Sequence, residues 1–176
     1  MIFRETRLSG AFIIELEKFE DDRGFFARTW SEREFEARGL DPCIDECNVS
    51  FNKEKGTLRG MHYQASPHAQ TKIVRCTMGS MYDVIIDLKQ ESPTFKQWIA
   101  VELTAENRLA LYVPRGFAHG FQTLEDNTEV FYQMSGVFVP ESGRGVRWDD
   151  PAFGISWPGT ERIMAARDRE YPDFSG

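Results

Sequence analysis

The sequence predicts an all-β fold, a jelly-roll barrel or sandwich with a few short helices. From residue 71 to 139 it is a series of short apolar runs, each too short for a globular helix and many of them rich in β-branched or aromatic residues. Turn residues separate the runs, as at 78–80 (MGS), 114–116 (PRG) and 125–127 (EDN). Because these turns are regularly spaced, a jelly roll is favoured over an open sheet.

Six of the runs are expected to form antiparallel strands. We expect them to span Thr71–Cys76, Met81–Leu88, Gln97–Leu103, Leu109–Val113, His119–Leu124 and Glu129–Ser135. The stretch 56–64, GTLRGMHYQ, precedes them and is typical of an apolar strand with a tight turn. A barrel built from such strands has a mouth lined by several of them, and a ligand usually binds there.

One helix is well signalled. Ser31 and Glu34 form a capping-box pattern, and Gly39 stands where a helix would end. The pattern predicts a helix from Glu32 to Arg38.

Length and composition limit the possible functions. The chain has 176 residues, 41% of them hydrophobic, and we expect a single domain over residues 1–176. A net charge of -7 argues against nucleic acid as a partner. No apolar run approaches the ~20 residues that span a bilayer, and the first residues lack the apolar region of a signal peptide, so we expect a cytoplasmic protein without a membrane partner. Cys43, Cys47 and Cys76 form no CxxC pair and are expected to be small buried or half-buried thiols.

Two stretches resemble the two motifs of cupins, which in metal-binding members supply a His-x-His pair, a carboxylate and a further histidine. They are residues 56–62 and 114–119, but the second position of the first pair is Gln64. A ligand of the metal is therefore missing, and we expect no metal. His68 lies in a loop by composition and is expected at the surface.

A site without metal is the favoured interpretation of the remaining residues. Arg59, His62, Lys72 and His119 are expected on neighbouring strands, with their side chains entering one barrel. Arg59 and Lys72 are poor core residues, because a buried charge needs a partner, and together they suit an anionic ligand. A regular strand would place Arg59 and His62 on opposite faces, so Gly60 between them is predicted to mark a bulge or bend that turns both inward.

Two further residues complete a possible acid–base site. Tyr132 alone is more typical of packing, but opposite a histidine base its phenol is a plausible proton donor. Asp168 lies in the tail, and if the tail folds back onto His62 its carboxylate would hold the tautomer of the imidazole and raise its basicity.

Taken together, eight stretches resemble the dTDP-4-dehydrorhamnose 3,5-epimerase family. They occur in order along nearly the whole chain: DDRGFFART (21–29), GTLRGMHYQ (56–64), TKIVRC (71–76), ESPTFKQW (91–98), PRGFAHGF (114–121), EVFYQ (129–133), GVRWDDPAFGISWP (145–158) and ARD (166–168). The resemblance implies a cupin-type jelly roll, a homodimer, no cofactor, and inversion of the carbons beside the 4-keto group of a nucleotide-linked 6-deoxysugar.

The resemblance also implies a role for each site residue. His62 would be the base, Asp168 its orienting partner, Lys72 the group that stabilises the enolate, and Tyr132 the acid on the opposite face. Substrate-binding roles would fall to Arg23, Arg28, Glu46, Asn48, Arg59, His119, Arg167 and Phe138, the last stacking on thymine. Glu46 and Val137 depart from the glutamine and tyrosine common in the family, and both changes lie on the substrate-recognition side.

Three alternatives to a 3,5-epimerase stay open on the sequence. The nearest is a relative that inverts only C3 or only C5, or that accepts another nucleotide or sugar. The second is a metal-dependent cupin enzyme, and the third is a sugar-nucleotide binder without catalytic activity.

Overall fold

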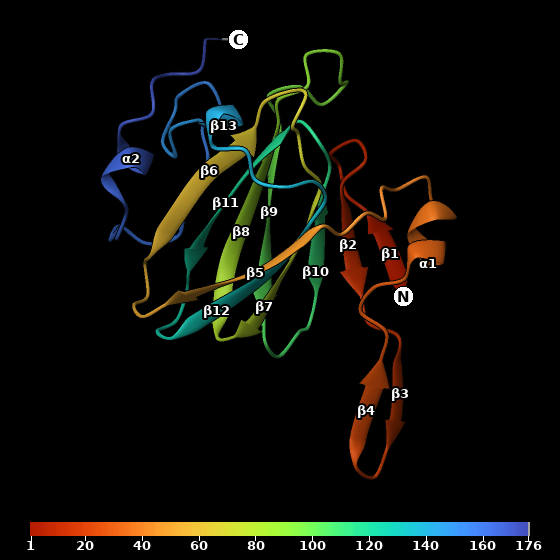
Figure 1. Cartoon of the computed structure of the whole chain (residues 1–176). Helices are drawn as coiled ribbons and strands as arrows, with labels where there is room; N and C mark the ends of the chain where they lie inside the picture. The colour runs from red at the N-terminus through yellow and green to blue at the C-terminus, as the bar shows by residue number, and fades with distance from the viewer. Residues whose placement is uncertain (176) are drawn as a thin grey trace.

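The computed structural model describes residues 1–175, and its strands form two antiparallel sheets packed face to face (Figure 1). The first sheet has six strands in the order β1-β2-β10-β7-β12-β5, which span Ile2–Glu5 (β1), Phe12–Glu15 (β2), Ala110–Val113 (β10), Lys72–Met78 (β7), Thr128–Met134 (β12) and Glu46–Asn52 (β5). The second has five in the order β13-β6-β11-β8-β9, which span Gly143–Gly145 (β13), Leu58–Gln64 (β6), Phe117–Thr123 (β11), Ser80–Asp87 (β8) and Trp98–Thr104 (β9). The predicted jelly-roll sandwich is confirmed.

All six strands predicted between residues 71 and 135 are present, with their ends within two residues of the expected positions. Along each of these strands, every second side chain points into the space between the two sheets. Their inward side chains form the central cluster, which includes Val74, Leu111 and Val130 from the first sheet and Ile85 and Phe121 from the second. Each of these five is at most 1% exposed, so burial of this face holds the two sheets together.

The predicted placement of Lys72 on a strand next to Arg59 and His62 is wrong. Lys72 begins β7 in the first sheet, whereas Arg59 and His62 lie on β6 in the second. The turn between β6 and β7 carries the chain from one sheet to the other, so these residues face each other across the sandwich instead of lying side by side.

The predicted helix is shorter than expected. It spans Glu32–Glu36 (α1) and ends near Gly39, which has the left-handed φ of 67° expected there. Ser31 makes no side-chain capping bond, and Glu34 accepts a hydrogen bond from Arg28 at 3.3 Å. Phe35 attaches α1 to the outer face of the first sheet. Of the helices described in residues 1–175, none is long and apolar enough to cross a membrane.

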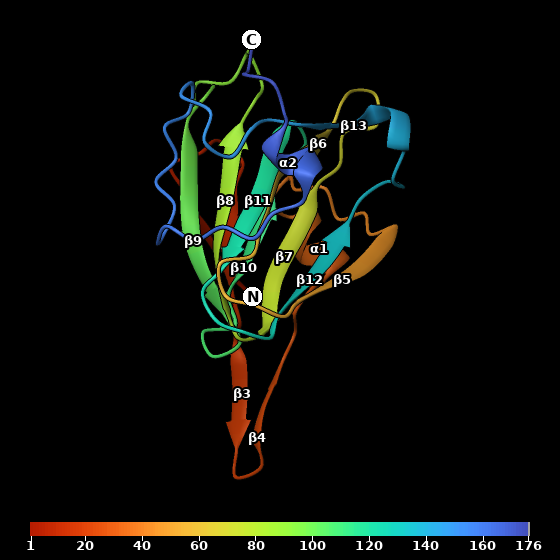
Figure 2. The same ribbon diagram turned by 90° about the vertical axis from the view of Figure 1, so that its left-hand side faces the viewer.

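A separate two-stranded hairpin projects from the sandwich (Figures 1 and 2). It consists of Lys18–Asp21 (β3) and Gly24–Ala27 (β4), which pair only with each other. Phe19 and Phe26 face each other across it and are 65% and 72% exposed. This element was not predicted.

The C-terminal segment covers the outer face of the second sheet and carries the short helix Ala166–Arg169 (α2) (Figure 2). Val146 and Phe153 of this segment pack against Met61, Val84 and Ile86. The segment thereby passes beside β6.

The cysteines differ in part from expectation. Cys76 is buried as predicted, but Cys43 and Cys47 are exposed.

Candidate active site

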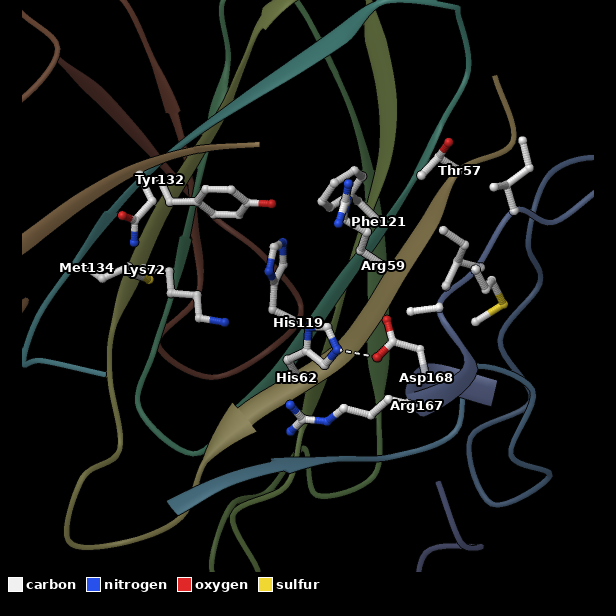
Figure 3. Close-up of a pocket in the computed structure, with 15 residues that line it drawn as sticks. Thr57, Arg59, His62, Lys72, His119, Phe121, Tyr132, Met134, Arg167 and Asp168 are labelled. Carbon is white, nitrogen blue, oxygen red and sulfur yellow. Dashed lines mark hydrogen bonds and ion pairs between the residues drawn. The ribbon is translucent and has the colours of Figure 1, made fainter. Parts of the chain in front are cut away.

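A cavity of about 650 Å³ opens between the sheets (Figure 3). Strands β5, β7 and β12 of the first sheet and β6 and β11 of the second line it, and residues 163–168 border one side. It contains these predicted site residues: Asn48, Arg59, His62, Lys72, His119, Tyr132, Arg167 and Asp168.

A bulge in β6 turns Arg59 and His62 into the same cavity. Between them, Gly60 and Met61 lie opposite the single residue Gly120 of β11. Gly60 has a φ of 129°, and a Cβ atom built on it would lie 2.5 Å from Cα of Gly120. Only glycine fits at this position, and the bulge predicted at Gly60 is confirmed.

His62 contacts the carboxylate of the tail, as the sequence suggested. Its Nε2 lies 2.7 Å from Oδ1 of Asp168, and the N–H of Gly60 donates to Oδ2 of Asp168 at 3.1 Å. Burial by itself would raise the pKa of Asp168, but the bond and charge of His62 and the Gly60 N–H together lower it. The ionised carboxylate fixes Nε2 as the donor, which leaves Nδ1 of the imidazole as an acceptor.

Lys72 and Tyr132 enter the cavity from the opposite sheet (Figure 3). Burial lowers the pKa of Lys72 to about 8, and the charge of Asp83 opposes this shift. Burial, and secondly the charge of Asp83, raise the pKa of Tyr132 well above its usual value, so its phenol is protonated at neutral pH. At neutral pH the cavity therefore holds a lysine that is mainly in its ammonium form and a neutral phenol.

Asp83 is a buried partner that the sequence reasoning missed. Its Oδ1 lies 2.6 Å from Nε2 of His119, and the two side chains are 0% and 4% exposed. Burial lowers the pKa of His119 although Asp83 opposes this shift, so the imidazole is neutral and donates to the carboxylate. An aspartate inside the apolar run 81–88 was a signal, because a carboxylate on the inward face of a strand needs a partner.

Arg59 is oriented by a second residue that the sequence reasoning missed. Its Nε donates to Oδ1 of Asn52 at 2.7 Å, and Asn52 is only 2% exposed. The amide of Asn52 in turn donates to the carbonyl of Thr128 at 3.1 Å. The guanidinium is thus directed into the cavity, and only its Nε–H is used in the bond to Asn52.

Phe138 lies beside the main cavity, on a smaller hollow of about 170 Å³ that shares Asn48, His62, Lys72 and Met134 with it. Oε1 of Glu46 accepts a bond from the Phe138 N–H at 3.4 Å. Neither Glu46 nor Phe138 lines the main cavity. The carboxylate of Glu46 therefore contacts the loop backbone that carries Phe138.

Gln64 secures the same loop. Its Oε1 accepts from the Val139 N–H at 2.7 Å, and its Nε2 donates to the carbonyls of Val137 at 3.2 Å and His68 at 2.9 Å. The residue that stands where metal-binding cupins have a second histidine is therefore a buried structural link between two loops.

Arg23 and Arg28 are not brought into the cavity of their own chain. Arg23 lies in the turn of the β3–β4 hairpin, is 90% exposed at its side chain, and pairs with Asp21 at 2.5 Å. Arg28 follows the hairpin and pairs with Glu34 at 3.3 Å. Neither lines the cavity of this chain, and their predicted contact with substrate stays a prediction.

Among residues 1–175, no group of three or more His, Cys, Asp and Glu side chains could hold a metal ion. His62 and His119 each contact an aspartate, and His68 is exposed with its Nδ1 2.8 Å from Oγ of Ser142.

Comparison with known proteins identifies the family of this chain. The family model described as dTDP-4-dehydrorhamnose 3,5-epimerase matches residues 5–176. A protein of that name from Sinorhizobium fredii is 39% identical over 175 residues, which cover 99% of this chain and 90% of the relative. This chain belongs to the dTDP-4-dehydrorhamnose 3,5-epimerase family. It is an isomerase.

Solved structures of relatives have the same fold. The dTDP-4-dehydrorhamnose 3,5-epimerase from Bacillus anthracis, with TDP and PPi bound, has a TM-score of 0.94 and 41% identity, covering 98% of this chain and 99% of that one. A 3'-monoepimerase from Streptomyces bikiniensis in complex with dTDP-quinovose has a TM-score of 0.87 and 32% identity, covering 96% and 85%. The family thus includes proteins named for inversion at two carbons and at one.

Proposed function

We propose that this protein inverts C3 and C5 of dTDP-4-dehydro-6-deoxy-D-glucose, as a cofactor-independent dTDP-4-dehydrorhamnose 3,5-epimerase. The observation that carries the proposal is the placement of a histidine base and a tyrosine acid on opposite walls of one cavity, with an ammonium group beside them (Figure 3). Inversion of a carbon needs a proton removed on one face and returned on the other, and this arrangement supplies both groups.

His62 is the base in this proposal. Asp168 holds its Nε2–H, so Nδ1 takes the proton from the carbon next to the 4-keto group. The electrons of the C–H bond form a carbon–carbon double bond, and the ketone oxygen becomes an enolate.

Lys72 stabilises the enolate oxygen. A proton beside a ketone is acidic enough to remove only if the developing negative charge is met by a fixed cation or donor. Its ammonium group serves this purpose, and the surrounding low dielectric that lowers its pKa to about 8 also strengthens its attraction for the oxyanion.

Tyr132 returns a proton to the opposite face. The enolate collapses to the ketone as the new C–H bond forms, and the phenolate and imidazolium then exchange protons with solvent. A phenol with a raised pKa stays protonated until the carbanion-like carbon is there to receive the proton.

Substrate recognition falls to the polar residues around this centre. Arg59 and Arg167 would bind the diphosphate, and Asn48 and His119 the sugar. Phe138 would stack on the nucleobase from the adjoining hollow. Glu46 acts indirectly, through the loop that carries Phe138, which accounts for a carboxylate being tolerated near a diphosphate site.

Solvent exchange tests the proposal. In D₂O the protein should introduce deuterium at both C3 and C5 of dTDP-4-dehydro-6-deoxy-D-glucose, measured by NMR and mass spectrometry. Tyr132→Phe should lower the rate of inversion by about 10²- to 10⁴-fold while exchange with retained configuration continues, because His62 then returns deuterium to the face it came from. If the unsubstituted protein exchanged deuterium at neither C3 nor C5, an epimerase role on this substrate would be refuted.

Inversion of one carbon only is the second candidate. It is favoured by the departures at Glu46 and Val137 and by the likeness to the 3'-monoepimerase. Deuterium at C3 alone or at C5 alone would establish it.

A homodimer is part of the proposal. The exposed Phe19 and Phe26 on a hairpin without support from either sheet favour a second copy as the surface that covers them. The same contact would carry Arg23 and Arg28 toward the cavity of the partner, which would restore their substrate-binding role.

A further inference from the structure

Tyr171 lies against the proposed base without belonging to any residue set considered so far. Its ring meets the imidazole of His62 edge to face, with centroids 6.2 Å apart and planes at 72°. The ring also lies against Gly145 of β13, which is the cross-strand partner of His62 in the β13–β6 ladder. Tyr171 therefore touches both the base and the backbone directly beside it.

Asp168 and Tyr171 are three residues apart, so one short segment supplies two side chains that contact His62. Asp168 lies in α2, and Tyr171 follows the last residue of that helix, Arg169, by two positions, so both side chains come from one short segment. The carboxylate contacts Nε2 of His62 at 2.7 Å, and the ring contacts the imidazole edge. The position of the ring and the position of the carboxylate are thus linked through one turn of backbone.

Gly145 makes room for this ring. A Cβ atom built on Gly145 would overlap Cε1, Cε2 and Cζ of Tyr171, so no other residue fits while the ring is in place. Gly145 does not have a left-handed φ, so the close approach and not backbone conformation requires glycine. The position of the Tyr171 ring therefore explains why residue 145 is glycine.

The contacts of Tyr171 with His62 and Gly145 are made by its ring and not by its hydroxyl. The hydroxyl oxygen is buried without a hydrogen-bond partner of good geometry among residues 1–175, and burial raises the pKa of this phenol although the neighbouring Arg167 opposes the shift. Arg167 lies over the ring, with its Cζ 5.8 Å from the centroid. Packing on Gly145 and the cation–π contact with Arg167 therefore hold the side chain chiefly through its ring.

We propose that Tyr171, seated on Gly145, is a positioning residue for the reaction: it fixes the turn that brings Asp168 to His62 and acts on the imidazole through that carboxylate. This inference rests on the proposed role of His62 as base. Displacing the ring would let Asp168 move away from Nε2, so the tautomer and direction of the imidazole would no longer be fixed.

Kinetics of three single variants test the inference in the full-length protein. Tyr171→Ala and Gly145→Ala should each lower kcat by about 10- to 100-fold because the ring acts on the base, and a smaller rise in KM should accompany this because Arg167, a proposed diphosphate ligand, lies over the same ring. Tyr171→Phe keeps the ring and should retain most of the wild-type kcat. Thermal unfolding measured alongside separates lost positioning from lost folding.

Two double variants show whether the effect passes through the stated contacts. Adding Tyr171→Ala to Asp168→Asn should lower kcat no further, because the carboxylate that the ring positions is already gone. Adding Gly145→Ala to Tyr171→Ala should also cost little, because the new methyl group meets no ring.

The outcomes distinguish this inference from the proposed function. If the wild type is active and Asp168→Asn is impaired, but Tyr171→Ala keeps its kcat, the positioning role is wrong and the epimerase assignment stands. The positioning role would likewise be wrong if the two losses of kcat multiplied in the Asp168→Asn, Tyr171→Ala double variant. If wild-type protein exchanges no deuterium into the 4-keto sugar, the proposed function itself fails.

Discussion

At the scale of single residues, the cavity is organised around one buried carboxylate. Asp83 contacts His119 directly, and its charge also raises the pKa of both Lys72 and Tyr132. For Lys72 this charge favours the ammonium form, whereas for Tyr132 it favours the neutral phenol. Both are the forms that the proposed reaction needs, and Asp83 favours them without lining the cavity itself.

Lys72 should give the reaction an alkaline limit. Its pKa of about 8 means that the ammonium group is lost as the pH rises through that value, whereas the raised pKa of Tyr132 keeps the acid protonated there. We expect kcat/KM to fall above about pH 8, since this parameter reports ionisations of the free enzyme. The measurement is a pH profile on the 4-keto sugar nucleotide.

Asp83→Asn provides the matched comparison for that profile. Removing the carboxylate charge takes away the effect that raises the pKa of Lys72, so the alkaline limb should move to lower pH. A limb that stays in place, or a wild-type profile that is flat well above pH 8, would show that Lys72 does not set the limit.

At the scale of the elements, β6 determines the site because it departs from a regular strand. The bulge at Gly60 and Met61 places Arg59 and His62 on one face, and the free N–H of Gly60 also binds Asp168. One irregular stretch of backbone thereby directs Arg59 and His62 into the cavity and binds Asp168, the partner of His62.

Gly60→Ala should be among the more damaging single substitutions in the chain. The methyl group would lie 2.5 Å from Cα of Gly120, on backbone that cannot move aside, and φ is 129°. We expect a loss of about 3 kcal/mol or more in the free energy of unfolding, measured by urea denaturation.

Gly39→Ala is the control for backbone conformation alone. Gly39 also has a positive φ, 67°, but nothing lies within 4 Å of a Cβ built there. Gly39→Ala should lower the free energy of unfolding by about 1 kcal/mol. Equal losses for the two variants would show that the approach of β6 to β11 is not what requires glycine at residue 60.

The elements also show what the sequence could predict and why it could not predict more. Strands β7 to β12 were predictable because alternation and turn residues are local properties, and the bulge followed from two inward residues spaced by three. The assignment of β6 and β7 to different sheets depends on long-range packing, and so does the contact of Asp83 with His119. Tyr171 and Gly145 are 26 residues apart with no local pattern joining them.

At the scale of the whole molecule, the β3–β4 hairpin is the part of the chain that the sandwich does not explain. It carries Phe19 and Phe26 exposed on strands that pair with nothing else in the described residues, and a lone two-stranded hairpin is at best marginally stable in water. A second copy of the chain would give it a surface to pack on.

Charge on the hairpin should therefore weaken self-association. We expect the wild type to sediment as a dimer and Phe19→Asp, Phe26→Asp to shift toward monomer at the same concentration, because burying two carboxylates in an apolar contact is costly. Substitution of Glu5, which is exposed on β1 away from the hairpin, by Lys serves as a charge control and should leave the sedimentation coefficient unchanged. A wild type that is monomeric throughout would rule out the proposed dimer.

If the hairpin reaches the cavity of the partner, Arg23 acts on a site that contains the other chain's His62. Arg23→Ala and His62→Ala proteins should then each be impaired alone, while a heterodimer of the two contains one cavity with both residues intact. Random re-association of equal amounts after mild dissociation should restore about a quarter of the wild-type site concentration, since about half of the dimers are mixed and each has one intact cavity. Activity that does not rise above the sum of the two separate proteins would mean that Arg23 does not act across the dimer, because an arginine acting on its own chain's cavity leaves every site defective.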